Sequence, residues 1–586
     1  MRKEGRGRMI LNLIIIVLIF LGFGSFLFFF FRKGRDTVVE IEKMEYTLEW
    51  LAKQVRHSFD QSLRVNIREL NLNMTESLKV ERQRKKLKKA YKDCPLGDKG
   101  DKNYVKDYIR NLLQSQFKVD EETIDLWIDF NNVKKLNNAT KFLILLNEYK
   151  KTYGYDALKE IILQNNLDVL RKEGQEEGYY IDEKDLNRLI FQNKINLDFY
   201  DKLEVLTQLI YQNNNGNGVV DEILDMNVDG VSGGESGIPE WALDDSVSSI
   251  LSHNLIYSYD SIWIFFQAKK IHLRFLSFGS EKELERVCKN VYQYDHPGQL
   301  SASNGYKINQ MKNGSRVTVL RPNLTESWVF IIRKFDNVVA KEINEVTKNE
   351  TISDILISLV KGCQVIAVTG QQGTGKTTLL KSLIGYINSN FPLRIQELEF
   401  ELWVRKLYVN RSIITFRETD MTKGEEALEV IRKSDGGVTI FGEVVSPIVA
   451  AWLVSTAHVA TRMTMFTHHA DSTKVLVNTF RNALLTKGGF SNESIALEEV
   501  VGAIRFDVHV EVIQDEQGKM IRFIERVTEI VPDEEKIYRL NDVVQYDYET
   551  GNYIFRSISE GTLKKMRKTM KQEDFKKLQM IFENVG

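Results

Sequence analysis

A glycine-rich stretch at residues 370–378, GQQGTGKTT, constrains the fold of this chain more than any other feature. It fits the phosphate-loop pattern G-x-x-x-x-G-K-[ST]. Residues 364–369 before it form a short β-branched run typical of a buried parallel strand, and residues 377–387 after it are apolar at helical spacing. Strand, glycine loop and helix together wrap backbone N–H groups round an anion at the positive end of a helix. The stretch therefore predicts a site for nucleotide phosphates.

The chemistry of such a loop gives its residues separate roles. Lys376 is expected to reach the β and γ phosphates of ATP, and the Thr377 hydroxyl is expected to bind Mg²⁺. The predicted ATP-binding residues are Gly370, Gln371, Gln372, Gly373, Thr374, Gly375, Lys376, Thr377 and Thr378.

The pattern after the loop alternates strands with helices, which predicts a doubly wound α/β domain with its ligand at the carboxyl ends of the strands. The expected strands are residues 393–399, 412–416, 437–441 and 463–467, and the expected helices are residues 425–433 and 447–458. Residues 507–512 and 521–527 are expected to add antiparallel strands. An α+β domain with strands up to residue 332 is expected before the loop.

Acidic residues follow two of these strands. Glu443 comes after an apolar strand, as the Walker B carboxylate that holds Mg²⁺ does, so we expect it to bind the metal with Thr377. Glu399 at the end of residues 393–399 is expected to orient or deprotonate the attacking water, with Glu397 and Glu401 as close rivals.

Histidines and arginines complete the predicted site. His468 and His469 follow another strand and cannot both point the same way, so we expect His469 to sense the γ-phosphate and His468 to be structural. Arg333 is expected to stabilise charge on the phosphates, as Arg316 and Arg321 could, with surface salt bridges as the alternative.

The N-terminal region carries a membrane signal. Residues 9–31 contain no charge and span 23 residues, against the roughly 20 that cross a bilayer. A cleaved signal peptide is the alternative, although its apolar core is usually about 7–15 residues and no A-x-A site follows. Because ATP is cytoplasmic, we expect a single-pass cell-membrane protein with its ATPase domain in the cytoplasm.

A helical stalk is expected next. Its apolar residues Ile41, Met44, Leu48, Leu51 and Val55 are spaced as in a short heptad seam. The seam predicts either self-association or packing on the same chain. Residues 82–89 are strongly basic, which fits either anionic lipid headgroups or a solvated helix face.

At 586 residues the chain is too long for one domain. We expect an anchor over residues 1–35, a helical region over 36–175, an α+β domain over 176–345 and the P-loop domain over 346–586. The net charge of −1 makes nucleic acid unlikely as a direct ligand, and the three separated cysteines indicate neither a zinc ribbon nor a disulfide framework.

Five features together indicate a known family: the phosphate loop, Glu399, Gly442-Glu443, residues 467–470 (THHA) and, before the loop, Arg333. In these features the chain resembles the secretion ATPase superfamily, especially its Tad pilus and type IV secretion branch. The resemblance covers about residues 180–530. It implies a RecA-like core, a homo-hexamer, ATP between the N-terminal domain and the core, and a partner that is a membrane platform protein of a secretion or pilus system. It assigns Glu399 to the Asp box, Glu443 to Walker B and His469 to the His box.

The chain also departs from the family. Phe400 follows Glu399 where the family often has Asp, and Val445 stands where the family commonly has Arg. Most members lack a membrane helix of their own. We therefore expect a membrane-anchored ATPase motor, with a nucleic-acid motor or a nucleotide-gated membrane scaffold of little turnover as alternatives.

Overall fold

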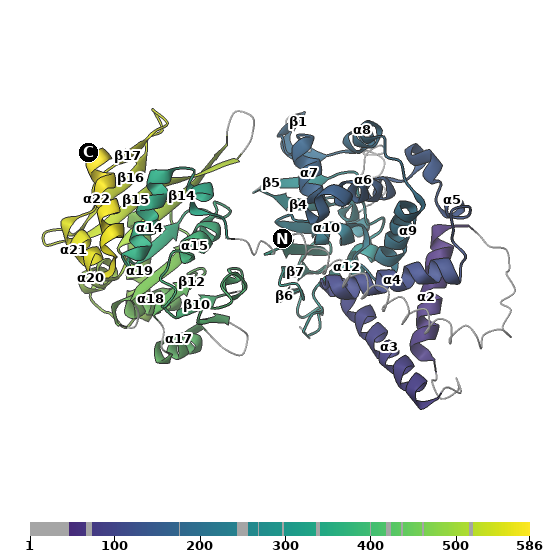
Figure 1. Ribbon diagram of the computed structural model, residues 1–586, viewed down its shortest axis with the longest axis horizontal. Coiled ribbons are helices and arrows are strands. Elements are labelled where there is room, and N and C mark those ends of the chain that lie inside the picture. The colour runs from purple at the N-terminus through teal and green to yellow at the C-terminus, as the bar shows by residue number, and fades with distance from the viewer. Residues whose placement is uncertain are drawn as a thin grey trace, which may run out of the picture. The chain divides into compact units, whose positions relative to one another are not determined.

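The computed structural model describes residues 46–65, 73–174, 176–242, 256–267, 269–295, 298–335, 340–398, 400–417, 424–434, 437–459, 462–514 and 520–585. The chain divides into two compact units, drawn in Figure 1. Unit 1 ends at Lys334, and unit 2 begins at Phe335 and also includes the short segment Gln267–Lys269.

Unit 1 is built on an eight-stranded sheet with the strand order β1-β2-β5-β4-β3-β8-β7-β6. The strands are β1 (Arg171–Glu173), β2 (Glu176–Ile181), β3 (Gly230–Gly233), β4 (Ile262–Phe266), β5 (Lys269–Leu273), β6 (Tyr306–Gln310), β7 (Arg316–Leu320) and β8 (Val329–Arg333). In β7 the alternate residues Val317 and Val319 are fully buried, as the two-residue period of a strand with one covered face requires.

Helices supply the rest of unit 1. They are α2 (Leu48–Arg64), α3 (Met74–Asp93), α4 (Lys99–Ser115), α5 (Ile124–Trp127), α6 (Asn138–Tyr153), α7 (Ala157–Gln164), α8 (Glu183–Asn193), α9 (Phe199–Asn214), α10 (Asp221–Asp225) and α12 (Glu281–Val291). Leu51 and Val55 of the expected heptad seam are fully buried in a core shared with α4 and α9. Packing on the same chain thus accounts for this part of the seam, while Ile41 and Met44 lie outside the described residues.

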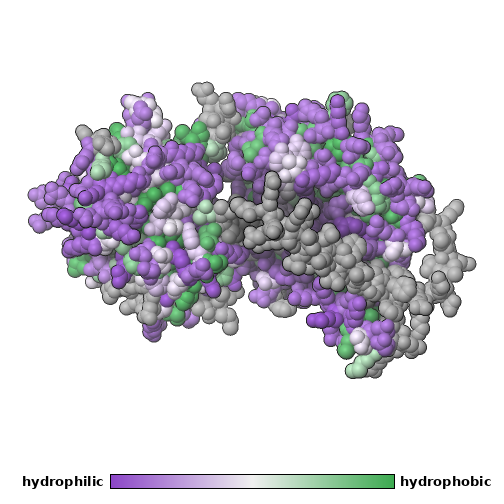
Figure 2. Space-filling view, viewed as in Figure 1, coloured by the Kyte–Doolittle hydropathy of each residue, from purple (hydrophilic) through white to green (hydrophobic). Residues whose placement is uncertain are grey.

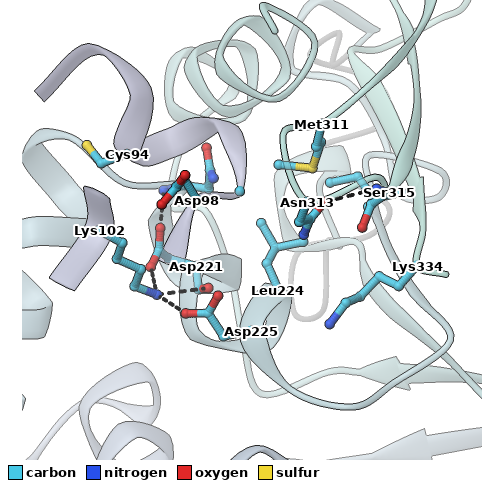
Figure 3. A pocket seen from close by; sticks show the side chains of 13 residues that line it. Cys94, Asp98, Lys102, Asp221, Leu224, Asp225, Met311, Asn313, Ser315 and Lys334 are labelled. Carbon is cyan, nitrogen blue, oxygen red and sulfur yellow. Dashed lines mark hydrogen bonds and ion pairs between the residues drawn. The ribbon is translucent and has the colours of Figure 1, made fainter. Parts of the chain in front are cut away.

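Buried ion pairs join α4 to α10. The Lys102 ammonium is 3.2 Å from Glu222 and 2.6 Å from Asp225, and it also pairs with Asp221. Burial alone would lower the pKa of Lys102, but these carboxylates outweigh it and raise that pKa well above its usual value. Figure 3 shows this lysine beside a cavity of about 20 Å³, which has room for roughly one water.

Unit 2 contains a nine-stranded sheet with the order β11-β10-β12-β13-β9-β14-β15-β16-β17. The strands are β9 (Ile366–Thr369), β10 (Leu393–Glu397), β11 (Ile413–Arg417), β12 (Val438–Phe441), β13 (Met463–His468), β14 (Phe506–Gln514), β15 (Met520–Asp533), β16 (Ile537–Tyr546) and β17 (Tyr553–Phe555). The first six strands in this order are parallel, and the last three continue the sheet in antiparallel fashion.

Helices cover both faces of this sheet. They are α13 (Ile343–Thr347), α14 (Glu350–Lys361), α15 (Lys376–Ile384), α16 (Val404–Leu407), α17 (Gly424–Lys433), α18 (Pro447–Val459), α19 (Thr473–Lys487), α20 (Glu493–Ala503), α21 (Glu560–Thr569) and α22 (Gln572–Val585). Ile366 and Val368 of β9 pack in one core with α14 and α15, whereas Ala367 packs in a second core with α18, α19 and α20. Unit 2 therefore has the mixed α/β architecture that the alternating pattern predicted.

The predicted single-pass localisation in the cell membrane needs correction. Within the parts of the chain that the structure describes, none of the helices combines the length and the apolar character that a bilayer crossing demands. The apolar helix α18, for example, has 13 residues, short of the roughly 20 required. Hydrophilic side chains cover most of the face that Figure 2 shows. Residues 9–31, on which the prediction rested, lie outside the described residues.

Candidate nucleotide site

The phosphate loop connects β9 to α15 and depends on glycine at three positions. Gly370, Gly373 and Gly375 have φ angles of 136°, 81° and 104°, a region that side chains with a Cβ rarely adopt. A Cβ at Gly370 would also lie 2.3 Å from the backbone oxygen of Val510 on β14. The loop can therefore take this shape only with glycine at its start.

Lys376 is the first residue of α15 and is 6% exposed. Its ammonium donates to the backbone oxygens of Gly370 at 2.9 Å and Gln371 at 2.7 Å. Its third contact, at 3.3 Å, is with Nδ1 of His469. Burial lowers the pKa of Lys376 to about 8, although the carboxylate of Glu443 acts in the opposite direction. The cation inside the loop thus titrates near physiological pH.

A histidine connects this lysine to the acidic residue after β12. Nε2 of His469 lies 2.7 Å from Oε1 of Glu443. Because an ammonium group can only donate, Nδ1 of His469 accepts from Lys376, and in the neutral ring Nε2 then carries the proton that is donated to Glu443. The neighbouring strands β12 and β13 are parallel, so their carboxyl ends bring Glu443 and His469 together.

His468 points to the opposite side of β13. It is 8% exposed, and its Nδ1 lies 2.8 Å from the backbone oxygen of Val444. Its ring meets the ring of Phe480 edge-on. Burial lowers the pKa of His468, so this histidine is held neutral inside the second core of unit 2.

The strand that the sequence analysis extended to Glu399 ends at Glu397. Glu399 itself lies outside the described residues. Glu397 is 3% exposed, and its Oε1 accepts from the backbone N–H groups of Glu401 at 2.9 Å and Leu402 at 2.8 Å. A Cβ at Gly442, next to Glu443, would lie 3.0 Å from Cγ of Glu397. Glu397 thus lies at the end of β10, next to Gly442, the residue before Glu443.

The environment of Glu397 suits a proton acceptor. Burial raises the pKa of Glu397 to about 7, against the effect of the two backbone N–H groups that it accepts from. A general base works best when its pKa lies near the working pH.

The other loop residues take positions consistent with a phosphate cradle. Thr377 and Thr378 lie on the first turn of α15 and are half-buried, while Gln371 and Gln372 are exposed. Thr374 is fully buried and donates its hydroxyl to the backbone oxygen of Gln371 at 3.0 Å.

A metal ion at this site would need ligands from the nucleotide as well as from the protein. Among the described residues, no group of three or more His, Cys, Asp and Glu side chains is arranged to hold a metal. Mg²⁺ is usually bound through one or two carboxylates together with substrate phosphates rather than in an all-protein cage. The expectation that Thr377 and Glu443 hold a Mg²⁺ ion that arrives with ATP therefore stays a prediction.

Arg333 is the last residue of β8 and lies directly opposite Arg316 of β7. Both arginines belong to unit 1, whereas the phosphate loop belongs to unit 2. The structure thus brings Lys376, Glu443 and His469 together and leaves the role of Arg333 a prediction.

A buried network that no sequence motif indicates supports the start of the loop. The hydroxyl of Thr369, the last residue of β9, donates to Asp507 at 2.5 Å and lies 2.9 Å from Nδ1 of His509. The other oxygen of Asp507 accepts from the hydroxyl of Thr473 at 2.7 Å. Asp507 and His509 are well over 100 residues from Thr369, and the pairing of β14 with β9 brings them together, so no local motif could have revealed the network.

Comparison with known proteins finds similar solved structures. No model of a known protein family and no curated protein matches the chain. The chain is similar to the solved structure of the ATPase DotB from Legionella pneumophila, with 15% identity, a TM-score of 0.35, and coverage of 53% of this chain and 78% of that chain. It is also similar to the VirB11 ATPase of the Brucella suis type IV secretion system, with 16% identity, a TM-score of 0.26, and coverage of 51% and 88%.

A third similar structure is the pilus retraction motor PilT with bound ADP, at 13% identity and a TM-score of 0.36, covering 62% of this chain and 88% of that chain. The three similar structures are thus an ATPase, the ATPase of a type IV secretion system and a pilus retraction motor. Because the TM-scores lie below 0.5, the function of the chain has to be argued from its own residues.

Proposed function

We propose that the protein is a Mg²⁺-dependent ATPase that powers secretion or pilus assembly. The observation that carries this proposal is the continuous contact from Glu443 through His469 to Lys376. It joins the Walker B carboxylate, the histidine after β13 and the phosphate-loop lysine in one site. Three motifs that lie up to about 100 residues apart in the sequence thus converge where a phosphate loop would hold the end of ATP.

Separate residues of unit 2 bind phosphate, hold the metal and accept a proton during phosphoryl transfer. Lys376 gives up its contacts with loop carbonyls for the stronger, charge-assisted bonds to phosphate oxygens. Thr377 and Glu443 would hold Mg²⁺, which would supply positive charge beside the transferring phosphoryl group. Glu397, with its pKa of about 7, accepts a proton from the attacking water.

His469 is proposed to report whether the phosphate is present. Without nucleotide it takes the third N–H of Lys376. When a phosphate oxygen takes that N–H, Nδ1 of His469 loses its donor while Nε2 remains with Glu443. The ring of His469 therefore responds to the phosphate through Nδ1 and transmits the changed hydrogen bonding through Nε2 to Glu443, the proposed metal ligand.

Assembly and partners follow from the superfamily resemblance. We propose a homo-hexamer that acts on a platform protein of a secretion or pilus system, with Arg333 as an additional contact to the nucleotide. Sedimentation of the full chain with Mg²⁺-ATP tests the hexamer, and a species that stays monomeric at micromolar concentration would remove that part of the proposal.

The activity itself is tested with three variants of the full chain. Glu443→Gln is expected to bind ATP but to lose turnover, and His469→Ala is expected to lower turnover more than it lowers ATP affinity. His468→Ala, the matched control, removes the histidine that faces away from the site. If wild type binds ATP and releases no phosphate above the Glu443→Gln level, the proposal of an ATPase is wrong, and a nucleotide-gated scaffold replaces it.

Helix α3 favours a nucleic-acid motor as a second candidate. It carries eight Lys and Arg residues against three Asp and Glu residues. Val80 and Leu87 are buried on its inner side, while Arg82, Lys85 and Lys89 are exposed on the outer side. A basic helix face of this kind attracts phosphate backbones. DNA-stimulated turnover that disappears when these three residues become Gln would support this candidate, and turnover indifferent to DNA would remove it.

A further inference from the structure

A hairpin of the antiparallel half of the sheet lies against the phosphate loop. The backbone oxygen of Val510 on β14 closes the space beside Gly370. Arg522 on β15 lies on the partner strand, opposite Val512. Its Nε donates to the backbone oxygen of Gly373 at 3.2 Å, and its Cδ lies 3.5 Å from where a Cβ of Gly375 would be. The loop is thus contacted along its length by two strands that the motif does not include.

Arg522 uses one N–H of its guanidinium on this contact. A guanidinium carries five N–H groups. Among the residues that the structure describes, the bond from Nε to Gly373 is the one polar contact of Arg522 that we find. Arg526, four residues further along β15, is different because it pairs with Glu525 and donates to the backbone oxygen of Asp471 at 3.1 Å. Arg522 therefore holds its charge beside the loop with most of its donors uncommitted.

The negatively charged phosphates of a nucleotide would provide acceptors for the uncommitted N–H groups of Arg522. A triphosphate carries about four negative charges at neutral pH, since each phosphate ester group carries about one to two. Lys376 supplies one positive charge inside the loop, and Val445, exposed next to Val444, supplies none. A second cation at the edge of the cradle would stabilise a bound polyphosphate, and the planar fork of arginine matches phosphate oxygens in pairs.

We propose that Arg522 is a phosphate-binding residue of the nucleotide site, with Nε fixed on the loop and its terminal nitrogens donating to the phosphates of ATP. The proposal rests on the proposed ATPase function, because it needs a nucleotide in the loop. It assigns the β14–β15 hairpin a part in nucleotide recognition, through a side chain that the phosphate-loop motif does not include.

The test is calorimetric titration of the full chain with Mg²⁺-ATP. Arg522→Gln is expected to raise the Kd about 10- to 100-fold, the usual effect of losing hydrogen bonds to a charged group. Arg522→Lys keeps the charge without the fork and is expected to fall between this variant and wild type. Arg539→Gln, which removes an exposed arginine on β16 of the same sheet, is the matched control and is expected to stay within about twofold of wild type.

Melting of the nucleotide-free variants separates ligand binding from loop structure. The proposal expects Arg522→Gln to melt within about 1 °C of the Arg539→Gln control. It is overturned if wild type binds ATP and Arg522→Gln binds it equally well. It is also overturned if Arg522→Gln loses melting temperature together with affinity and Arg522→Lys restores neither. If wild type itself binds no ATP, the proposed function fails, and that outcome is distinct from both of these.

Discussion

The lowered pKa of Lys376 predicts an unusual pH dependence for ATP binding. With a pKa of about 8 in the free protein, against an ordinary value of 10.5, Lys376 loses its proton within the range of a normal assay. A bound phosphate chain favours the ammonium form and raises this pKa. Above pH 8 the free protein must therefore take up a proton in order to bind ATP, and its affinity falls as the pH rises.

The magnitude follows from the position of that pKa. Each pH unit above it weakens binding about tenfold, so that the Kd for ATP rises about 25-fold between pH 7.5 and 9.5. A lysine with its ordinary pKa would change the Kd by only about 1.1-fold over the same range. Because phosphate groups have a second pKa of about 6, the charge of the nucleotide is constant in this window.

The assay is calorimetric titration with ATP at several pH values and constant ionic strength. Lys376→Arg is the matched control, since its guanidinium stays charged throughout and any affinity that it retains should not change with pH. A flat profile for wild type would refute the reasoning, because it would show that burial does not bring this pKa down. The same lowered pKa of Lys376 affects folding in the opposite direction: ATP affinity falls as the pH rises, whereas stability increases. Since the unfolded chain holds this proton more tightly, Lys376 makes the free energy of unfolding rise with pH between about 8 and 10.5.

Three further predictions concern other residues. Turnover is expected to rise as the pH passes through about 7, where Glu397 loses its proton, and this rise should disappear in the pH–rate profile of Glu397→Gln. Gly370→Ala should abolish ATP binding in a calorimetric titration because its Cβ would meet the backbone at 2.3 Å, whereas Gly561→Ala, which has open space, should bind normally. Glu222→Gln should lower the free energy of urea unfolding by about 2 kcal/mol, since it removes the buried carboxylate that three lysines share while Lys102 and Lys106 keep their other partners. The pKa of Glu222 is held well below its usual value, by lysines that outweigh the effect of burial, so the stability that it provides is present at neutral pH and lost in acid.

Much of unit 2 could be read from the sequence because its signals are local. The phosphate loop needs glycines at fixed spacing, and the buried parallel strands on either side show as short β-branched runs. The alternation of side chains along a strand also separated His469 from His468, which the structure places on opposite sides of β13.

Local interactions between side chain and backbone set two boundaries that the pattern did not give. β10 ends at Glu397 because its carboxylate binds the backbone of the following turn. The segment before the phosphate loop forms two helices, α13 and α14, within the described residues. Lys348 adopts a φ of 54°, and Asn349 caps the second helix.

The remaining features of the site depend on which strands become neighbours. Arg522 reaches Gly373 only because β15 pairs with β14, which pairs with β9. A single sequence carries no record of such register. In the same way, the ion pairs of Lys102 in unit 1 join residues more than 100 positions apart, and helical spacing alone gives no hint of them.

The central claim is that Lys376 and Glu443 form one site for ATP hydrolysis. The most direct test is phosphate release from Mg²⁺-ATP by the purified full chain, beside Lys376→Ala and Glu443→Gln. The account predicts turnover by wild type that falls about 100-fold or more in both variants, the scale expected when a group acting on the transition state is removed. Equal phosphate release by all three proteins would contradict it.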